Sequence, residues 1–489
     1  MGSTLASIAE ALPGPTTVLG GEATIDDVTH DSRGVTAGSL FVAIPGDRFD
    51  GHSFIDSAIE DGAAALLVDR DADDHIPRIV TPDTRRAMAW AAREVHGQPD
   101  ASLSILGVTG TNGKTTVAHL CESVWQHAGT RCAIIGTLGA HIDGAPLPLK
   151  RTTPESSDLQ RLLGLMRDSN VHSVAMEVSS HALTLHRADA IRFTAVGFTN
   201  LTQDHLDFHG SMAEYLDSKR RLFSLDRSDK AVINIDDPAG SRIASETELD
   251  VVAVGLDYDA AIRATNVAGT ATGTRFVLDT PEGRADVDLP LAGRFNVDNA
   301  LVAAGLLRCD GVDLEHIAAG LSSVPAIPGR MEAIPHSGPF TVVIDYAHTP
   351  DAVSAVLRSA ASTAQGRVIA LVGAAGDRDP EKRSLMGAAA SRFADVTIVT
   401  TDNPRSEDPV LIAEEVRRGA LSHSRSTVEM IIDRAEAIHE GISMAEDGDV
   451  VLILGKGHEQ GQEVHGVVHP FDDRQVAAAV LADEGWGPT

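Results

Sequence analysis

Short apolar runs alternate with stretches of helical periodicity along most of the chain. Runs at 40–44 and 63–68 are bounded by Pro, Gly and Asp residues typical of turns. Further apolar runs of strand length occur at 103–108, 132–137, 174–178, 195–198 and 231–235. An amphipathic segment at 115–127, closed by Gly129, predicts a helix. Strands alternating with helices predict a mostly parallel sheet covered on both faces.

The same pattern restarts after 325–330, a Pro- and Gly-containing segment that we interpret as a linker. The strands predicted beyond it lie at 341–344, 368–372, 396–400 and 450–454. This is a second α/β unit of doubly wound type. A further linker is predicted at 97–100, and a length of 489 residues fits about three domains at roughly 150 residues each. We therefore expect an α/β protein of three domains.

Composition narrows the classes of partner. Hydrophobic residues make up 43% and charged residues 22%, as in an ordinary globular protein. The formal net charge of −30 argues against a nucleic-acid binder, because the field of the whole protein repels polyanions. The three cysteines have no paired spacing, which disfavours a disulfide framework. With no apolar run of ~20 residues and no basic residue before Arg33, we expect a cytoplasmic protein without membrane insertion.

The most specific motif is a glycine-rich turn between a predicted strand and a predicted helix: Gly110, Thr111, Asn112, Gly113, Lys114, Thr115 and Thr116. In such a loop, glycines let backbone N–H groups approach phosphates, Lys114 reaches the β/γ-phosphates and Thr115 ligates Mg²⁺. The spacing departs from G-x-x-x-x-G-K-[ST], because Val108 stands where the first Gly belongs. An ordinary turn is the alternative, but the strand–loop–helix context favours a nucleotide site.

Three residues are candidates for a metal site beside this loop. Glu177 ends a predicted strand, where a carboxylate is placed to meet a hard cation. His205 follows the strand at 195–198. Lys219 falls on the apolar face of a helix that begins with the capping-box sequence at 211–214. The plainer alternatives are a capped strand end, a hydrogen-bonded histidine and a surface lysine with its amine in solvent.

Burial gives Lys219 a chemical possibility. A buried ammonium is costly and tends to lose its proton. A neutral amine beside a metal can take up CO₂ to form a carbamate, which supplies an anionic oxygen ligand. The sequence therefore makes Lys219 a candidate for a carbamylated metal ligand.

Motifs extend in a fixed order over nearly the whole chain. They are Asp31-Ser32-Arg33, the loop at 110–116, Thr152-Thr153-Pro154, Glu-Val-Ser-Ser-His-Ala-Leu from Glu177, the segment 199–210, Ser-Lys-Arg-Arg-Leu-Phe from Ser218, Phe295-Asn296, Gly329-Arg330-Met331-Glu332, Asp-Tyr-Ala-His-Thr-Pro-Asp-Ala from Asp345, Gly376-Asp377-Arg378-Asp379, Asp402-Asn403-Pro404-Arg405 and Gly455-Lys456-Gly457-His458-Glu459. Together they resemble the Mur ligases of peptidoglycan synthesis.

The resemblance implies an N-terminal UDP-sugar-binding domain at 1–98, a central ATPase domain at 99–329 and a C-terminal Rossmann-like, amino-acid-binding domain at 330–489. It also implies ATP, Mg²⁺ and carbamylated Lys219 as cofactors. The implied catalytic residues are Lys114, Lys219, His205 and Arg330. The implied metal-site residues are Thr115, Glu177, His205 and Lys219. The implied nucleotide contacts are the loop 110–116, Asn296, Arg330 and Asp345.

The resemblance further implies two groups of substrate-binding residues. Those for the UDP-sugar and its dipeptide are Ser32, Asp47, Arg48, Phe49, Thr152, Thr153, Ser179 and Arg187. Those for the incoming amino acid are Arg378, Asp402, Asn403, Pro404, Arg405, Gly455 and Glu459. The Asp402–Arg405 motif resembles the signature of family members that add meso-diaminopimelate rather than lysine. Arg405 and Arg378 are suited to hold its distal carboxylate, and Glu459 its distal ammonium.

The implied reaction is ATP-dependent ligation. ATP phosphorylates the D-glutamyl carboxylate of UDP-N-acetylmuramoyl-L-alanyl-D-glutamate, and the amine of meso-diaminopimelate displaces the phosphate. This places the protein in cell-wall biogenesis, and hence in cell shape and division, and we expect a monomer. Three alternatives stay open: ligation of L-lysine or another diamine, a folylpolyglutamate synthetase, and a P-loop ATPase switch without ligation. The first hundred residues and the Asp402–Arg405 motif disfavour the synthetase.

Overall fold

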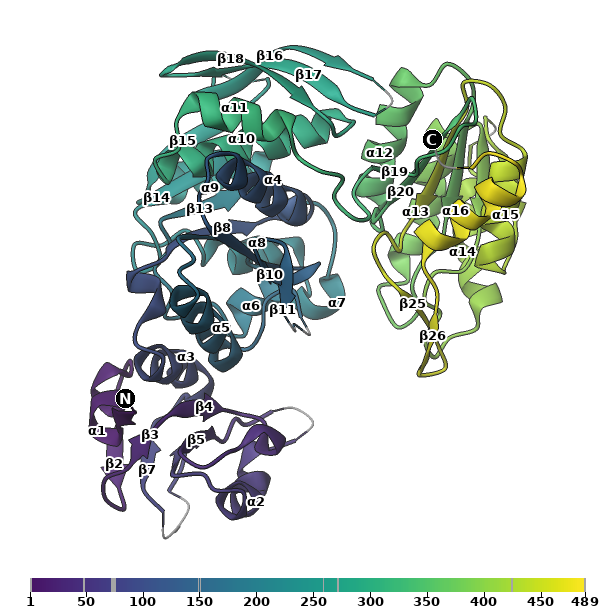
Figure 1. Ribbon diagram of the computed structural model, residues 1–489. Coiled ribbons are helices and arrows are strands. Elements are labelled where there is room, and N and C mark those ends of the chain that lie inside the picture. Colours follow the sequence, from purple (N-terminus) through teal and green to yellow (C-terminus); the bar gives the residue numbers. More distant parts are fainter. Residues whose placement is uncertain are drawn as a thin grey trace.

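The structure is a computed structural model that describes residues 2–46, 49–71, 76–147, 149, 151–257, 259–270, 272–423 and 425–487. Its helices and strands form three α/β units in chain order. In Figure 1 the N-terminal unit lies below the central unit and the C-terminal unit lies to the right of it. This agrees with the fold class predicted from the sequence.

The N-terminal unit is a small sheet covered by helices on both faces. Its strand order is β2-β7-β6-β5-β4, parallel except for the edge strand β2. Helices α1 and α3 pack against one face of the sheet and form one apolar core with it. Helix α2 packs against the other face and forms a second core. The elements are β1 (Ser3–Thr4), α1 (Leu5–Ala11), β2 (Thr17–Leu19), β3 (Thr24–Ile25), β4 (Asp27–Thr29), β5 (Ser39–Val42), α2 (Ile55–Glu60), β6 (Ala65–Val68), β7 (Arg78–Val80) and α3 (Thr84–Val95).

The central unit contains a sheet of order β11-β10-β9-β12-β8-β13-β14-β15-β16-β17-β18. In this order, each pair of adjacent strands from β9 through β12, β8, β13, β14 and β15 to β16 is parallel, as predicted. Antiparallel strands extend the sheet at both edges: β10 and β11 beyond β9, and β17 and β18 beyond β16. The strands are β8 (Ser104–Thr109), β9 (Cys132–Gly136), β10 (Gly139–Ile142), β11 (Ala145–Leu147), β12 (Ser173–Glu177), β13 (Ala195–Phe198), β14 (Lys230–Asn234), β15 (Asp250–Gly255), β16 (Ile262–Gly269), β17 (Thr274–Thr280) and β18 (Gly283–Leu289).

Alternate residues of the buried strands enter two separate cores. On β8, Leu106 and Val108 pack into one core and Ile105 into the other. Helices α4, α10 and α11 cover the first face and helices α5, α6, α8 and α9 the second. The helices are α4 (Lys114–His127), α5 (Ser156–Asp168), α6 (Ser180–Thr184), α7 (Leu206–His209), α8 (Met212–Arg220), α9 (Pro238–Glu246), α10 (Arg294–Cys309) and α11 (Leu314–Ser322).

The C-terminal unit repeats this layered design. Its sheet has the order β19-β20-β24-β21-β22-β23, parallel except at β19. Its elements are β19 (Glu332–Ala333), β20 (Thr341–Asp345), α12 (Pro350–Thr363), β21 (Val368–Val372), α13 (Glu381–Phe393), β22 (Val396–Val399), α14 (Pro409–Ala420), β23 (Thr427–Met430), α15 (Arg434–Ser443), β24 (Val450–Leu454), β25 (Gly461–Val464), β26 (Val467–Pro470) and α16 (Asp473–Asp483). The sheet carries α12, α13 and α14 on one face and α15 and α16 on the other.

The two expected linkers are packed rather than loose. Pro99–Ala101 is a short 3-10 turn in which Asp100 is buried and accepts a hydrogen bond of 2.8 Å from Arg93 Nε. In the second linker, Gly329 packs against the backbone of Gly457, where a Cβ would lie 2.5 Å from the carbonyl carbon. Both connections are therefore fixed by contacts at the unit borders.

Candidate active site

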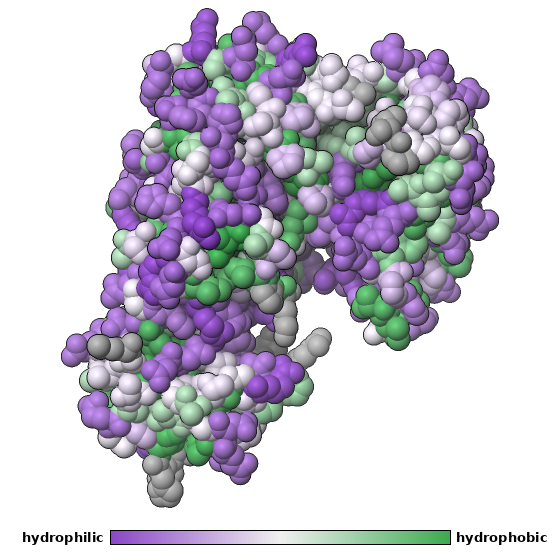
Figure 2. Space-filling view, in the orientation of Figure 1, coloured by the Kyte–Doolittle hydropathy of each residue, from purple (hydrophilic) through white to green (hydrophobic). Residues whose placement is uncertain are grey.

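A cavity of about 420 Å³ lies between the central and C-terminal units. The molecular surface is indented between these two units in Figure 2. The lining of the cavity includes thirteen of the residues predicted to contact the nucleotide, the metal or the acceptor: Thr111, Asn112, Gly113, Lys114, Thr115, Thr116, Thr152, Glu177, Ser179, His205, Asn296, Arg330 and Asp345. The structure therefore gathers residues from segments far apart in the sequence around one space.

The glycine-rich loop joins β8, the strand between β12 and β13, to the N-terminus of α4. Gly110 and Gly113 have φ angles of 152° and 90°, which favour glycine. A Cβ on Gly110 would lie 1.8 Å from Thr199 Oγ1, and one on Gly113 would lie 2.1 Å from Asn299 Oδ1. The free N–H groups at the start of α4 and its dipole favour an anion at this point.

Two lysines contact the same atom of this loop. Lys114 Nζ and Lys219 Nζ each donate a hydrogen bond of 2.8 Å to the carbonyl oxygen of Gly110. Lys219 is 1% exposed, and its Nζ lies 4.4 Å from the centre of the Tyr215 ring. Burial lowers the pKa of both amines, that of Lys219 well below its usual range. Repulsion from Lys114 adds to the effect at Lys219, and repulsion from Arg330 adds to it at Lys114. Burial therefore acts in the direction of the neutral amine predicted for Lys219.

The predicted capping box that leads into α8 is half formed. Ser211 Oγ accepts a hydrogen bond of 3.2 Å from Glu214 N, as expected. It also lies 3.2 Å from Glu214 Oε2, so the carboxylate accepts from the hydroxyl instead of reaching back to the Ser211 backbone. The apolar face is confirmed, because Tyr215, Leu216 and Lys219 are buried.

Glu177 lies at the end of β12 and is 1% exposed. Both of its carboxylate oxygens accept hydrogen bonds from Thr137. Its Oε1 accepts from Thr137 N at 2.7 Å and its Oε2 from Thr137 Oγ1 at 3.0 Å. Each carboxylate oxygen keeps lone pairs beyond these bonds, so the group is able to ligate a cation in the cavity. Thr115 and His205 line the same cavity.

Asp204, which is not among the site residues predicted from the sequence, connects the central unit to the C-terminal unit. Its Oδ2 lies 3.4 Å from His205 Nε2 and 3.8 Å from His348 Nε2, and its Oδ1 lies 3.9 Å from Lys382 Nζ. Although burial favours the neutral acid, His348 and the other cationic neighbours hold the pKa of Asp204 well below its usual range. Burial lowers the pKa of His205 to about 3, so its imidazole is neutral at pH 7.

The segment that leads into the C-terminal unit brings Arg330 and Asp345 to the cavity. Arg330 Nη2 donates to Thr115 Oγ1 at 3.2 Å, and its guanidinium lies 4.6 Å from the Tyr346 ring centre. Asp345, whose pKa burial raises, accepts bonds of 2.8 Å from the Met331 and Ala347 N–H groups. Arg330 is thus placed against the loop that would hold phosphates.

Asn296 enters the same cavity from α10. It is 2% exposed, and its Nδ2 donates to Ala292 O at 2.8 Å. Its Oδ1 accepts from Asn299 Nδ2 at 3.2 Å, which links it to the side chain packed over Gly113. Asn296 therefore lies beside the loop, as the predicted nucleotide contact requires.

The residues predicted for the dipeptide form a second group beside Glu177. Thr153 Oγ1 donates to Glu177 O at 2.9 Å and accepts from Ser179 N at 3.2 Å. Thr152 Oγ1 lies 3.2 Å from Thr137 Oγ1. Arg187 Nη2 pairs with Glu155 Oε1 at 2.9 Å.

Three arginines surround the carboxylate of Glu155 at the border with the N-terminal unit. Besides Arg187, its carboxylate lies 3.0 Å from Arg85 Nη1 and 2.5 Å from Arg151 Nη1. Although burial favours the neutral acid, Arg187 and Arg85 lower the pKa of Glu155. Three guanidinium groups around one carboxylate leave an excess of positive charge for an anionic acceptor.

The Asp402–Arg405 motif forms a polar network next to the end of β24. Asn403 Nδ2 donates to Glu459 Oε2 at 2.8 Å, and buried Lys456 bridges Asn403 Oδ1 at 3.1 Å and Glu459 Oε2 at 3.0 Å. Gly455 packs against Asp402, where a Cβ would lie 2.6 Å from Oδ2. Pro404 is buried in the same segment.

Arg405 has a φ angle of 52°, and its side chain already has partners. Its Nε lies 3.2 Å from Glu463 Oε2 and its Nη1 donates to Gly376 O at 2.6 Å. The residues of the motif do not line the cavity. Tyr346 connects the motif's network to the cavity, because it lines the cavity and its ring centre lies 5.2 Å from that of His458, the residue before Glu459.

Some predicted contacts lie away from these groups. Ser32 is in a 3-10 turn of the N-terminal unit, capped by Asp31. Phe49 is 73% exposed and Arg378 is exposed, with no ion pair to any residue that the structure describes. The predicted contacts at Asp47 and Arg48 lie outside the described residues.

Family profiles match three consecutive parts of the chain. The profiles are those of the Mur ligase family catalytic domain at 24–96, the Mur ligase middle domain at 108–307 and the Mur ligase glutamate ligase domain at 329–457. The chain is 44% identical to the UDP-N-acetylmuramoyl-L-alanyl-D-glutamate–2,6-diaminopimelate ligase of Streptomyces coelicolor over 93% of this chain and 92% of that protein. This chain belongs to the Mur ligase family.

Further relatives agree with this assignment. The 2,6-diaminopimelate ligase of Geobacillus thermodenitrificans is 43% identical to the Mur ligase described here, over 98% of this chain and 99% of its own length. A solved structure of a UDP-N-acetylmuramoyl-L-alanyl-D-glutamate–2,6-diaminopimelate ligase is 32% identical with a TM-score of 0.69, and the match covers 94% of this chain and 96% of that one. The similarity thus extends over all three units.

Proposed function

We propose that this Mur ligase joins meso-diaminopimelate to the D-glutamyl γ-carboxylate of UDP-N-acetylmuramoyl-L-alanyl-D-glutamate at the expense of ATP. The observation that carries the proposal is the cavity that places the phosphate loop, Arg330 and the Thr152–Ser179 group around one space. Nucleotide and acceptor groups must meet in such a space for a phosphoryl group to pass between them.

The reaction we propose has two steps. An oxygen of the acceptor carboxylate attacks the γ-phosphorus of ATP and the bond to the ADP oxygen breaks, which gives an acyl phosphate. The amine nitrogen of diaminopimelate then attacks the carbonyl carbon, the bond to the phosphate oxygen breaks and the ammonium proton is released. Lys114 and Arg330 lie where positive charge would stabilise the phosphoryl group in transit.

The residues around Glu177 fit a divalent cation. Thr115, Glu177 and His205 offer a hydroxyl, a carboxylate and a neutral imidazole to the cavity. Mg²⁺ bound there would neutralise charge on the phosphates and the acceptor carboxylate. The chain supplies only part of the coordination, as expected for Mg²⁺.

We propose that Lys219 acts as a carbamate. Its neutral amine would attack CO₂, forming an N–C bond and releasing a proton. The anionic product would attract the ammonium group of Lys114, which shares Gly110 O with Lys219, and would stabilise the position of Lys114. Carbamylation would also add an anionic oxygen that is able to ligate a cation.

We propose that the Asp402–Glu459 network binds the distal end of diaminopimelate. Arg405 and Arg378 would bind its carboxylate, and Glu459, with one oxygen shared by Asn403 and Lys456, would bind its ammonium. L-Lysine lacks that carboxylate and would leave Arg405 without its substrate partner.

The unit borders fit the three domains expected from the sequence, and we propose the boundaries at 98/99 and 329/330. The first domain would hold the UDP-sugar through Ser32. Among the described residues, no helix combines the length and apolarity that crossing a membrane requires. The cytoplasmic location, the monomeric state and the roles in cell shape and division stay predictions.

The proposed reaction is tested by ADP release from the purified protein with UDP-N-acetylmuramoyl dipeptide, with and without meso-diaminopimelate. We expect sustained ADP release only when both are present, and an amide product one diaminopimelate heavier than the acceptor. Equal ATP turnover without the UDP-sugar would favour a P-loop ATPase switch instead.

A further inference from the structure

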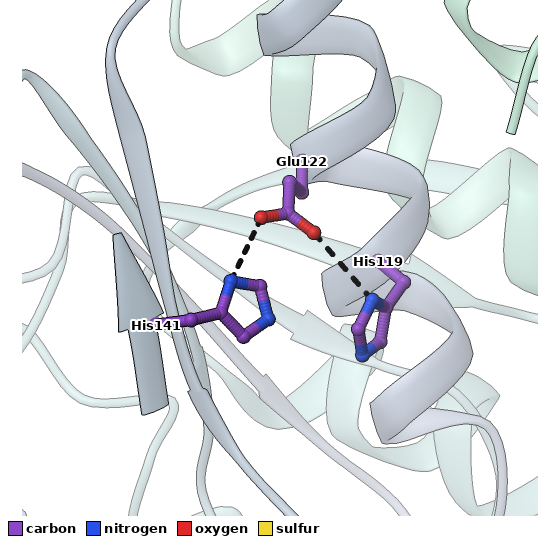
Figure 3. Close-up of side chains that lie close together, drawn as sticks. All are labelled: His119, Glu122 and His141. Atoms are coloured by element: carbon purple, nitrogen blue, oxygen red, sulfur yellow. Dashed lines mark ion pairs between the residues drawn. The ribbon is translucent and has the colours of Figure 1, made fainter. Parts of the chain in front are cut away.

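A compact polar cluster lies on the helix that follows the phosphate loop, away from the active-site cavity. His119 and Glu122 are one turn apart on α4, and His141 projects toward them from β10 (Figure 3). Each carboxylate oxygen of Glu122 points to one imidazole: Oε1 lies 3.0 Å from His141 Nδ1 and Oε2 lies 3.5 Å from His119 Nδ1. Neither histidine nor Glu122 lines the cavity described above.

The spacing of these atoms is that of metal ligands. One ligand atom from each residue lies within 4.8 Å of the other two. Nitrogen and oxygen ligands bind Zn²⁺ at about 2.0–2.2 Å, so two such ligands of one ion are separated by roughly 3–3.5 Å. The distances of 3.0 and 3.5 Å within the cluster already match that separation.

Hydrogen bonding within the protein leaves the cluster incomplete. Glu122 is 8% exposed, yet no Lys or Arg among the described residues pairs with it. Glu122 Oε1 and His141 Nδ1 form an ion pair without hydrogen-bond geometry, and His119 Nε2 is buried without a hydrogen-bond partner in the described part of the chain. A buried carboxylate that faces two neutral imidazoles has no full positive charge to balance it, and a bound cation would supply that charge.

We propose that His119, Glu122 and His141 bind one transition-metal dication of the Zn²⁺ class. Two imidazoles and one carboxylate favour Zn²⁺ over Mg²⁺, which prefers oxygen ligands in octahedral geometry. The three side chains are 11–15% exposed, which gives an ion a narrow approach from solvent and room for water as the fourth ligand. The site is distinct from that of Glu177 and His205.

The ion would fasten an edge hairpin to the nucleotide-binding helix. Strand β10 is antiparallel to β9 and pairs with β11, so it lies outside the parallel part of the sheet. His119 lies only five positions after Lys114 on the same helix, α4. A bound ion therefore stabilises the folded central unit without entering the reaction.

The test measures Zn²⁺ binding to tag-free protein by calorimetry and thermal unfolding, with Mg²⁺ and ADP in excess to occupy the active site. The variants are Glu122→Gln, which preserves the size of the side chain, and His141→Asn, which replaces the imidazole with a smaller polar group. His172→Asn is the matched control, because His172 is exposed and lies outside the cluster. Co²⁺ in place of Zn²⁺ reports tetrahedral nitrogen and oxygen ligation by its visible absorption.

We expect one Zn²⁺ per chain and a Zn²⁺-dependent rise in Tm for the wild type and His172→Asn. Binding should weaken by more than about 100-fold in Glu122→Gln and in His141→Asn, since loss of a residue that only supports a ligand already costs 10–100-fold. The unmetallated variants should keep the wild-type circular dichroism spectrum. Absence of Zn²⁺ binding by the wild type, or equal binding by either variant, would overturn the proposal.

Discussion

Lys114 and Lys219 share one carbonyl oxygen, and that contact sets the chemistry expected of each. Both Nζ atoms lie 2.8 Å from Gly110 O, where Lys219 is buried and Lys114 faces the cavity. Two ammonium groups there would repel each other with little solvent screening. A charged Lys114 beside a neutral or carbamylated Lys219 removes this conflict.

Replacement of Lys219 by Ala should lower kcat by about 100-fold or more, the usual cost of losing a group that positions charge for the transition state. Activity is measured as ADP release with both substrates, and added formate or acetate should restore part of it by supplying the missing carboxylate. Lys230→Ala, on an exposed lysine, is the control. An Ala variant with full activity would remove the carbamate from the account.

Arg405 tests the basis of amino-acid selection. Arg405→Ala should raise the KM for meso-diaminopimelate by about 10–100-fold, because a hydrogen bond to a charged group contributes about 1.5–3 kcal/mol. The KM for the UDP-sugar should not change, and Arg425→Ala on exposed Arg425 serves as the control. A parallel rise in both KM values would indicate damage to the fold rather than loss of a selective contact.

Helix α4 depends on the two glycines that flank it. Gly113, which precedes the helix, has a φ of 90° and no room for a Cβ beside Asn299, whereas Gly129, just beyond its end, has a φ of 71° and open space. Gly129→Ala should therefore cost about 1 kcal/mol of unfolding free energy from backbone strain alone.

Gly113→Ala should cost more than Gly129→Ala and also abolish nucleotide binding, measured by calorimetry with ADP. The difference between the two variants isolates the close packing of the loop from the backbone strain that they share. Equal effects of the two substitutions would show that the loop tolerates a side chain at this position.

Asp189, in the segment after α6, predicts that the stability of the folded protein depends on pH. It is 6% exposed and lies 2.9 Å from His186 Nδ1 and 2.5 Å from Arg227 Nη2. Although burial favours the neutral acid, these two partners lower the pKa of Asp189 to about 2 from 3.8. A pKa lowered in the folded state adds stability above the unfolded pKa, and this stability is lost as the pH falls from about 4 to 2.

Asp189→Asn should accordingly reduce the unfolding free energy by roughly 2 kcal/mol at pH 7, and the difference from wild type should vanish near pH 2. Denaturant unfolding across this pH range measures it. Asp229→Asn, on an exposed carboxylate, is the control and should stay within about 0.5 kcal/mol of wild type. A difference for Asp189→Asn that does not change with pH would contradict this assignment.

The sequence predicted most of the buried strands to within two residues. The expected strands at 195–198, 368–372 and 450–454 have the bounds of β13, β21 and β24. Continuous apolar runs mark such strands because both faces are buried. The hairpin β17–β18 was missed because its strands alternate between polar and apolar residues, as at 284–289, instead of forming continuous apolar runs.

The site was predictable where a motif fixes a local shape and unpredictable where separate units meet. The loop 110–116 and the buried Lys219 follow from local pattern. The contacts of Asp204 with His348 and Lys382 join residues more than 140 positions apart, and no local periodicity encodes them. A lone acidic residue near a histidine gave no signal of that role.

Asp204 should therefore influence how closely the central and C-terminal units associate. Asp204→Asn removes the attraction to His348 and Lys382, so we expect a larger radius of gyration than wild type by X-ray scattering at low ionic strength. The difference should fall at about 1 M salt, where screening is strong. Asp207→Asn, on an exposed neighbour, is the control, and identical scattering of all three proteins would assign Asp204 to the site alone.

The choice of amino acid is the central claim, because it unites the nucleotide cavity with the Asp402–Glu459 network. The most direct measurement offers the enzyme equal concentrations of meso-diaminopimelate and L-lysine, with ATP and UDP-N-acetylmuramoyl dipeptide, and weighs the products by mass spectrometry. We expect the diaminopimelate product to exceed the lysine product by at least about 100-fold, since L-lysine lacks the distal carboxylate that would accept charged hydrogen bonds from Arg405 and Arg378. Comparable amounts of the two products would contradict the claim.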